Sequence, residues 1–357
     1  MPWHPPLALA LPLLILAYAP TPARAEPQAH VRLLATGGTI AGSGEAASAS
    51  YRAGIVPIGD ILRAVPGLED VATISAEQVA NIGSYDMSEP VWRKLAARAA
   101  AAGADPAITG VVVTHGTDTI EETAFFLSLV LPSTKPVVLV GSMRPGTAVS
   151  ADGAQNLLDA VRLASAADAC GRGVMLVMND TIFAPAFATK SDIRRVNAFA
   201  APARGPAGDM LTDRPRFFAA GVAPREAAFA LGEAELPKVA IAYAYAGMTG
   251  DDIRAAAKGA RGLVIAGVGA GSFPASAREA VKELTAKGFP VVRTARQGTG
   301  DVWINPPSMG DISDQVLGTI AGRELTPAKA RILLMLALQT PRGRPDLQAL
   351  FDRYGTM

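Results

Sequence analysis

The sequence predicts an α/β fold, because short apolar runs rich in β-branched residues alternate with helical patterns over most of its 357 residues. The runs that indicate strands are Val31–Ala35, Val111–Val113, Pro136–Val140 and Gly173–Met178. Helical patterns cover Ile58–Val65, Val91–Ala102, Thr119–Leu127 and Ala154–Ser165. Strands that alternate with helices pair in parallel, and the helices then cover both faces of the sheet.

A second α/β unit follows a stretch that is rich in Pro, Ala, Gly and Arg. Residues 211–237 show little helix or strand periodicity, so we expect an interdomain linker there. Beyond it, strands are expected at Val239–Tyr245, Gly262–Ala266 and Pro290–Arg293, and helices at Ser276–Lys287 and Ala328–Leu338. The sequence therefore predicts a larger domain over residues 30–210 and a smaller one over residues 238–357.

Residues 1–25 have the pattern of a secretory signal peptide. Leu7–Ala19 is apolar, and Ala23-Arg24-Ala25 fits a cleavage site with small residues, although Met1–His4 lacks the usual basic residue. The alternative is an uncleaved membrane anchor, but the apolar run is shorter than the ~20 residues that a spanning helix needs. The sequence therefore predicts export to the periplasm.

Composition disfavours several classes of protein. The formal net charge of +1 gives no reason to expect nucleic acid or an anionic membrane as a partner. The single cysteine, Cys170, cannot form an internal disulfide, and no His, Cys and carboxylate cluster has metal-ligand spacing. Residues 267–272 are glycine-rich but lack the Gly-x-Gly-x-x-Gly spacing of a dinucleotide site. We therefore expect neither a metal nor a cofactor.

One stretch combines a buried strand, a tight polar loop and the start of a helix. Val111–Val113 leads into Thr114-His115-Gly116-Thr117-Asp118, and a helix then begins after Thr119, a plausible N-cap residue. The acidic pair at 121 and 122 falls in the first helical turn, where the helix dipole favours negative charge. Loops at the carboxyl ends of strands are where α/β proteins bind ligands, so this loop is a candidate site.

A second strand ends in a loop of similar character. Val31–Ala35 is followed by Thr36-Gly37-Gly38-Thr39-Ile40. The two glycines allow a sharp turn that brings the Thr39 hydroxyl close to a ligand. The alternative is that this hydroxyl only stabilises the turn. The presence of the Thr117-Asp118 loop in the same sequence argues against this alternative.

Together these two loops resemble those of the asparaginase/glutaminase amidohydrolases, which carry a Thr-Gly-Gly-Thr-Ile loop and a His-Gly-Thr-Asp-Thr loop. The similarity extends through residues 81–84, 140–145 and 150–153, and covers nearly the whole chain after residue 30. It implies a larger flavodoxin-like domain with a parallel sheet, followed by a smaller Rossmann-like domain. It also implies a homotetramer with its sites at a dimer interface.

The resemblance implies hydrolysis of the side-chain amide of L-asparagine, with L-glutamine as a second substrate in part of the family. Thr39 attacks the amide carbon with help from Tyr51, which lies in the glycine-bearing segment 42–56 that closes over the substrate. Thr117 and Lys190 then activate the water that hydrolyses the acyl-threonine intermediate. The sequence itself does not distinguish which threonine attacks first.

The resemblance also assigns residues that bind the substrate amino acid. Ser84 would hold the α-carboxylate, and Thr117 and Asp118 line the same site, with Asp118 on the α-ammonium group. Tyr85 stands where the family often has glutamine or glutamate, so the preference between asparagine and glutamine stays open. The Ser272 loop would reach the neighbouring subunit's site.

A neighbouring subunit of the family also supplies a glutamate, and this chain departs from that pattern. Residues 303–311 contain no glutamate. Asp311 and Asp314 are the candidates to replace it, or the contact is missing.

Two other functions remain open from the residues alone. A periplasmic amino-acid-binding protein would share export and two α/β domains, but needs no nucleophile and no lysine behind it. A secreted esterase or protease would need a histidine base, and His115 is the only internal candidate. No Gly-x-Ser-x-Gly elbow accompanies it, which disfavours this second alternative.

Overall fold

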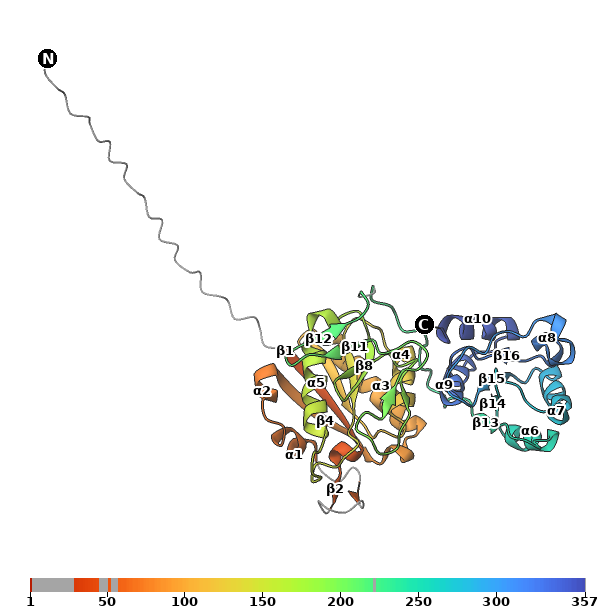
Figure 1. The fold of residues 1–357 in the computed structure, drawn as a ribbon, viewed down its shortest axis with the longest axis horizontal. Coiled ribbons are helices and arrows are strands. Elements are labelled where there is room, and N and C mark those ends of the chain that lie inside the picture. The colour runs from red at the N-terminus through yellow and green to blue at the C-terminus, as the bar shows by residue number, and fades with distance from the viewer. Residues whose placement is uncertain (2–28, 45–50, 53–56, 221–222, 357) are drawn as a thin grey trace.

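The computed structural model describes residues 1, 29–44, 51–52, 57–220 and 223–356. The predicted signal peptide lies outside this range, apart from Met1. The described chain forms two α/β units that lie side by side, the larger one first (Figure 1). This arrangement confirms the predicted fold class.

The larger unit is built on an eight-stranded sheet with the order β12-β11-β8-β7-β6-β5-β1-β4. Its strands are β1 (Ala29–Gly37), β4 (Ala72–Ile82), β5 (Gly110–Thr114), β6 (Val137–Val140), β7 (Val174–Met178), β8 (Thr181–Phe183), β11 (Gly208–Met210) and β12 (Pro215–Phe217). The strands from β4 to β7 pair in parallel, and β8, β11 and β12 continue the sheet in antiparallel fashion. The parallel half therefore carries the carboxyl ends at which the two polar loops begin.

Helices cover both faces of this sheet, as the alternation predicts. Helices α3 (Glu89–Ala104) and α4 (Ile120–Val130) cover one face, and α1 (Ile58–Arg63), α2 (Leu68–Val71) and α5 (Gly153–Ser165) cover the other. Successive residues of β5 alternate between the faces: Val111 and Val113 pack with the first group, and Val112 packs with the second. All three valines are fully buried, which explains why this strand reads as a continuous apolar run.

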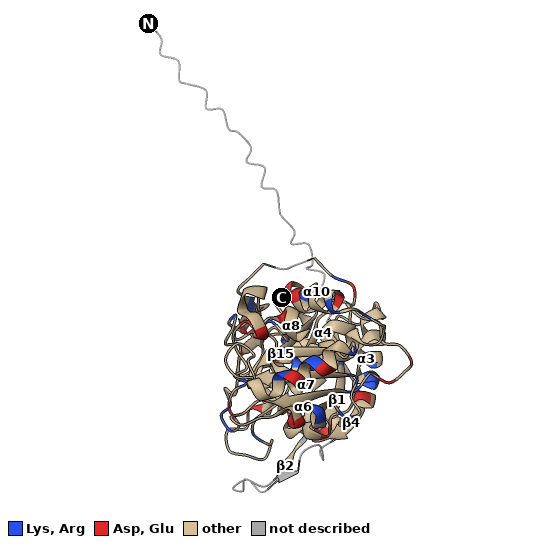
Figure 2. Ribbon diagram, turned by 90° about the vertical axis from the view of Figure 1, so that its right-hand side faces the viewer, with Lys and Arg blue, Asp and Glu red and all other residues tan. Residues whose placement is uncertain are grey.

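The smaller unit has four parallel strands in the order β13-β14-β15-β16. They are β13 (Val239–Tyr243), β14 (Gly262–Gly267), β15 (Val291–Ala295) and β16 (Ile320–Ala321). The helices are α6 (Gly250–Ala257), α7 (Ala275–Ala286), α8 (Asp314–Leu317), α9 (Pro327–Ala337) and α10 (Arg344–Tyr354). Acidic and basic residues are interspersed along α6 and α7 on the outer side of this unit (Figure 2).

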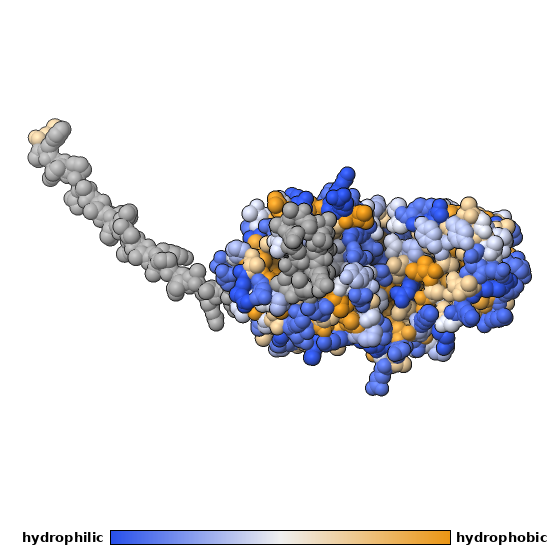
Figure 3. Space-filling model, turned by 90° about the horizontal axis from the view of Figure 1, so that it is seen from below, coloured by the Kyte–Doolittle hydropathy of each residue, from blue (hydrophilic) through white to orange (hydrophobic). Residues whose placement is uncertain are grey.

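The two units share one apolar core, because α4 of the larger unit packs against α9 of the smaller. An ion pair supports the junction. Arg204 donates to the Glu324 carboxylate from Nη2 at 2.6 Å and from Nε at 2.9 Å. Seen from below, apolar residues reach the surface near this junction (Figure 3). The units are therefore joined by packing as well as by the connecting chain.

Several elements have no clear pattern in the sequence. Strand β4 lies at a sheet edge and carries polar residues such as Thr73, Glu77 and Gln78, so its apolar signal is weak. Strand β12 lies within the stretch expected to be a linker, yet it forms the opposite edge of the large sheet. Edge strands pair on one side only, and their exposed side tolerates polar residues and proline.

Short elements complete the fold. The short strand pairs are β2 (Ser43–Gly44) with β3 (Tyr51–Arg52), and β9 (Thr189–Lys190) with β10 (Phe199–Ala200). The 3-10 turns are η1 (Thr39–Ala41), η2 (Ser84–Asp86), η3 (Ala167–Ala169) and η4 (Pro307–Ile312). No helix among the described residues is both long and apolar enough to cross a membrane.

Candidate active site

Three loops meet at one end of the large sheet, and glycines allow them to touch. Gly38 has a φ of 84°, and a Cβ atom added to it would lie 2.3 Å from the backbone nitrogen of Gly116. A Cβ atom on Gly116 would in turn lie 2.6 Å from Ser84 Oγ. Both distances are too short for an added side-chain atom. The first two loops therefore meet backbone to backbone at two glycines, and the Ser84 side chain packs on the Gly116 backbone.

Side-chain hydrogen bonds hold these loops together. Thr36 Oγ1 donates to Thr114 O at 2.8 Å, which joins the ends of β1 and β5. Ser84 Oγ accepts from the backbone N–H of Asp118 at 3.2 Å. Thr119 occupies the N-cap position of α4 as predicted, but its hydroxyl does not cap the helix. It donates to Ser84 O at 2.7 Å and thereby links the third loop to the helix start.

Lys190 reaches this loop cluster from β9. Its Nζ donates to Thr117 Oγ1 at 2.8 Å and to Asp118 Oδ1 at 2.6 Å. Thr117 is buried, and the Lys190 side chain is only 15% exposed, whereas the Asp118 side chain is 57% exposed. A buried hydroxyl, a nearly buried ammonium and an accessible carboxylate therefore form one connected group.

The Thr39 residue lies in the first of the three loops. It is buried and begins the turn η1, directly after the glycine that touches Gly116. Tyr51 lies in β3, which pairs with β2, but its side chain lies outside the described residues. The described geometry therefore places the Thr39 loop against the Thr117 loop.

A further loop supports Thr117 from behind. The Asp152 carboxylate accepts from the backbone N–H groups of Met143 and Arg144, each at 2.9 Å. Asn156 Nδ2 donates to Gly141 O at 3.0 Å. A Cβ atom on Gly141 would lie 3.0 Å from Thr117 Cγ2, so this loop packs directly on the candidate site. Asp152 and Asn156 were not among the predicted site residues, because they act on backbone and carry no reacting group.

His115 turns away from the site and into the core. It is fully buried, its Nδ1 lies 2.7 Å from Gly116 O, and its Nε2 lies 2.9 Å from Thr123 Oγ1. Thr123 Oγ1 also accepts from Trp92 Nε1 at 2.8 Å, so the threonine hydroxyl proton points at Nε2 and the ring proton sits on Nδ1. Burial lowers the pKa of His115 to about 4, and the histidine stays neutral. Its neutral ring is fully used in the core, which removes the hydrolase alternative that needed it as a base.

Tyr85 and Ser272 lie at more open positions. Tyr85 is 72% exposed, and its ring lies over Gly83, where a Cβ atom would come within 2.4 Å of Tyr85 Cζ. Ser272 is exposed in the smaller unit, where it exchanges two backbone hydrogen bonds of 2.8 Å with Val268. Gly267 and Gly271 pack against each other in this loop, so its glycines serve a tight turn.

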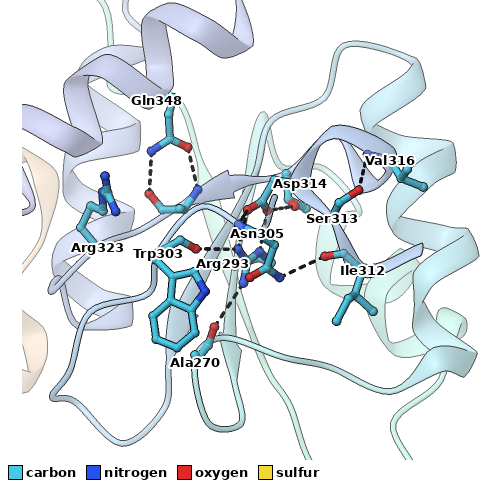
Figure 4. Close-up of polar contacts among 12 residues, drawn as sticks. Ala270, Arg293, Trp303, Asn305, Ile312, Ser313, Asp314, Val316, Arg323 and Gln348 are labelled. Carbon is cyan, nitrogen blue, oxygen red and sulfur yellow. Dashed lines mark hydrogen bonds and ion pairs between the residues drawn. The ribbon is translucent and has the colours of Figure 1, made fainter. Parts of the chain in front are cut away.

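Asp314 is ruled out as a replacement for the family's shared glutamate. It is buried, and its carboxylate binds Arg293 through Nε at 2.7 Å and Nη2 at 2.6 Å (Figure 4). Asn305 N also donates to it at 2.7 Å. Asp311 is exposed and pairs with Arg278. The buried Arg293–Asp314 pair therefore fixes the loops around Ala270 and Trp303, whose carbonyls Arg293 also binds.

Two charged residues that bear on the site were missed by the sequence analysis. Glu121 Oε2 accepts from the backbone N–H of Lys190 at 2.7 Å, and Lys329 lies fully buried on α9. The helix dipole alone accounts for the position of Glu121 in the sequence, so nothing there indicates its bond to Lys190. Lys329 occupies the first position of an apolar stripe that continues at 332, 333 and 336, and this was the available signal for a buried lysine.

No metal cluster forms in the part of the chain that the structure describes. Nowhere in it do three or more His, Cys, Asp or Glu side chains come together in a way that could hold a metal ion. The chemistry available at the site is that of hydroxyl, ammonium and carboxylate groups.

The fold and the loop cluster together define a class: a two-unit α/β protein whose polar loops bring threonine hydroxyls, a lysine and a carboxylate together and leave its buried histidine in the core. Comparison with known proteins identifies the family. The model described as "Asparaginase, N-terminal" matches residues 30–222, and "Glutaminase/Asparaginase C-terminal domain" matches residues 238–351. The chain belongs to this asparaginase/glutaminase family, which confirms the resemblance.

Named relatives are similar along most of the chain. "L-asparaginase 2" of Bacillus subtilis is 40% identical over 91% of this chain and 86% of its own length. "Glutaminase-asparaginase" of Pseudomonas aeruginosa is 38% identical over 98% of this chain and 97% of its own. The crystal structure of "Probable Cytoplasmic L-asparaginase" from Campylobacter jejuni has a TM-score of 0.85 and 40% identity, covering 92% of this chain and all of that one.

Proposed function

We propose that this protein hydrolyses the side-chain amide of L-asparagine to L-aspartate and ammonia, with L-glutamine as a second substrate. The observation that carries the proposal is the contact of Lys190 Nζ with Thr117 Oγ1 and Asp118 Oδ1, in a loop packed against the Thr39 loop. Relatives named as asparaginases and glutaminase-asparaginases support both substrates.

The first half-reaction forms an acyl-threonine. The Thr39 hydroxyl attacks the amide carbon while Tyr51 takes its proton. Tyr51 passes this proton to the amide nitrogen, and the tetrahedral intermediate collapses to the ester with loss of ammonia. Backbone N–H groups in the glycine-bearing loops stabilise the oxyanion, and one such donor is worth about 3 kcal/mol of barrier. Buried glycine backbone suits this role, because it brings N–H groups close to the reacting carbon without a side chain in between.

The second half-reaction hydrolyses the ester. A water molecule held by Thr117 attacks the ester carbonyl, and its proton passes through the Thr117 hydroxyl to the Lys190 side-chain nitrogen. Lys190 acts in this step in its neutral amine form, and it returns the proton to the Thr39 oxygen as the ester bond breaks. The 2.8 Å separation between Thr117 Oγ1 and Lys190 Nζ is within the range for such a transfer. Aspartate is the product, and the Thr39 hydroxyl is regenerated.

The substrate's charged groups have complementary partners nearby. The Asp118 carboxylate is accessible and binds the α-ammonium group, and Ser84 binds the α-carboxylate. The two side chains are already coupled, since Ser84 Oγ accepts from the Asp118 backbone N–H. The Tyr85 ring covers Gly83. Tyr85 thereby influences how long a substrate side chain the site accepts.

We also propose that the active protein is an exported homotetramer. Residues 1–25 serve as the signal peptide, and the periplasm is the destination. A Haemophilus influenzae relative carries the name "Probable L-asparaginase periplasmic", which supports this. The exposed Ser272 loop contributes to a neighbouring subunit's site. The boundary between the domains lies in the stretch between β12 and Pro237.

Ammonia release by the purified protein tests the proposal, with L-asparagine and L-glutamine assayed in parallel. We expect release from asparagine and its loss in a Thr39→Ala variant. A Thr39→Ala variant with near-full turnover would overturn the nucleophile assignment. Tight binding of asparagine without ammonia release would instead favour an amino-acid-binding protein.

A further inference from the structure

Lys329 is a fully buried lysine in a position that is unfavourable for a positive charge. It lies in the first turn of α9, and its exposed fraction is zero. Lysine is almost never fully buried without partners, and the positive end of a helix dipole repels a cation. Contacts outside α9 must therefore compensate for its placement.

The compensating partners lie in the other unit, just before the β9 strand. Lys329 Nζ donates to Ala186 O at 3.2 Å and also to Ala188 O. These carbonyls precede Lys190 by four and two residues. The carboxylates of Glu121 and Glu122 on α4 also act on the ammonium group, although burial dominates and lowers the Lys329 pKa to about 8.

The same segment is held on its other side by α4. The Lys190 backbone N–H donates to Glu121 Oε2 at 2.7 Å. Helices α4 and α9 pack against each other. Glu121 and Lys329, which hold the segment, therefore lie at the same contact between the units. Lys329 and Glu121 thus hold residues 186–190 at two carbonyls and one N–H, in addition to the pairing of β9 with β10. From this segment the Lys190 side chain extends to Thr117.

We propose that Lys329 is a positioning residue for the reaction: from the smaller unit it fixes the backbone of residues 186–188 and so places the Lys190 side-chain nitrogen against Thr117 and Asp118. This inference rests on the role proposed above for Lys190. Lys329 touches no substrate and acts only through the backbone. A displacement of about 1 Å at a reacting group lowers turnover by about 100-fold, which sets the scale of the expected effect.

A matched pair of substitutions on α9 separates positioning from general packing. Lys329→Met keeps an unbranched apolar side chain, one atom shorter than lysine, and removes the donor. Arg331→Met also removes a cation from α9, but Arg331 donates to Val239 O at 3.2 Å, within the smaller unit. Lys329→Gln retains an N–H donor that is one atom shorter, and serves if the methionine variant does not fold.

Two readouts are compared: the kinetics of ammonia release from L-asparagine, and hydrogen exchange of the Lys190 backbone amide. We expect Lys329→Met to lower kcat by 10- to 100-fold with KM within threefold, and to accelerate exchange at Lys190 at least tenfold. Arg331→Met should change both within twofold. Lys329→Gln should fall between wild type and Lys329→Met.

If Lys329→Met matches Arg331→Met in either readout, Lys329 is a structural residue only and the inference is overturned. The exchange measurement does not depend on catalysis. If the wild-type protein releases no ammonia, the proposed function fails by itself, and exchange at Lys190 still decides whether Lys329 holds the segment.

Discussion

Lys190 Nζ lies 2.8 Å from Thr117 Oγ1, although 73 positions separate the two residues in the sequence. In the proposed mechanism Lys190 takes the proton from Thr117, and replacing Lys190 with methionine removes that group. We expect steady-state ammonia release to fall by about 10²- to 10⁴-fold, the usual contribution of a positioned acid or base. One equivalent of ammonia per site should still appear in a rapid burst, because the proposed attack by Thr39 does not need Lys190.

Intact-protein mass spectrometry of Lys190→Met after mixing with asparagine would reveal the trapped aspartyl ester. Lys135→Met is the control, because Lys135 donates to the carbonyl of Asp105, away from the site. Turnover of Lys190→Met at more than half the wild-type rate would contradict the role of Lys190.

The close approach of the Thr39 and Thr117 loops predicts that Gly38→Ala is inactive. A methyl group there would lie 2.3 Å from Gly116 N, and the φ of 84° disfavours alanine even without that collision. We expect kcat to fall at least 100-fold and the melting temperature to drop. Gly146→Ala is the matched control, since nothing lies within 4 Å of the added methyl group. Equal activity of the two variants would show that the loops need no such contact.

Patterns confined to one segment allowed much of this site to be predicted. The apolar run Val111–Val113 followed by a polar loop is visible within a dozen residues, and so is the glycine pair before Thr39. The pairing of Lys190 with Thr117 is a long-range contact, and only the family resemblance linked them. The inward turn of His115 depends on backbone torsions and on Trp92, which lies on another helix.

Polar groups that act on the backbone were the hardest to find from the sequence. Lys329 and Glu121 hold the backbone around Lys190, and neither carries a reacting group. Their contacts join two units whose relative placement no local pattern encodes. Asp314 is the opposite case. Its position in the sequence suited a residue that is shared with a neighbouring subunit's site, but its carboxylate is buried in an ion pair with Arg293.

The buried His115 predicts acid destabilisation without a catalytic effect. Its folded-state pKa, about 4, lies below the ordinary value of 6.5, so the unfolded chain binds more protons between these pH values. Stability therefore falls as pH drops from 6.5 to 4, by about 3 kcal/mol at most. Urea unfolding at several pH values measures this, and His115→Gln should lose that part of the pH dependence.

His115→Gln should still release ammonia at neutral pH, within about tenfold of wild type, provided that the folded fraction is compared. A His115→Gln variant that folds but has no activity would show that His115 takes part in catalysis.

The Arg293–Asp314 pair predicts that substitutions at these two positions have strongly non-additive effects on the free energy of unfolding. Arg293→Met leaves a buried carboxylate without its guanidinium partner, which typically destabilises a protein by about 3–5 kcal/mol. Arg293→Met combined with Asp314→Leu should recover part of that loss, because no uncompensated charge then remains. Urea unfolding of the two single variants and the double variant gives the coupling. Additive losses would mean that the pair does not act as a unit.

Asp159 predicts a variant that is more stable than the natural chain. This carboxylate is buried on α5, and its Oδ2 lacks a geometric hydrogen-bond partner among the described residues. Burial, and after it the neighbouring Asp180 carboxylate, raises the pKa of Asp159 to about 6. The folded chain therefore binds more protons than the unfolded chain between pH 4 and 6, and stability declines as pH rises through that window. Asp159→Asn removes the charge but keeps an acceptor for Gln155, which donates to Oδ1 at 3.0 Å. We expect Asp159→Asn to be more stable by about 2 kcal/mol at pH 7.5 and to differ little at pH 4, as measured by urea unfolding. A variant less stable than wild type at pH 7.5 would mean that the Asp159 charge supports the fold through Arg162, which lies 3.6 Å away.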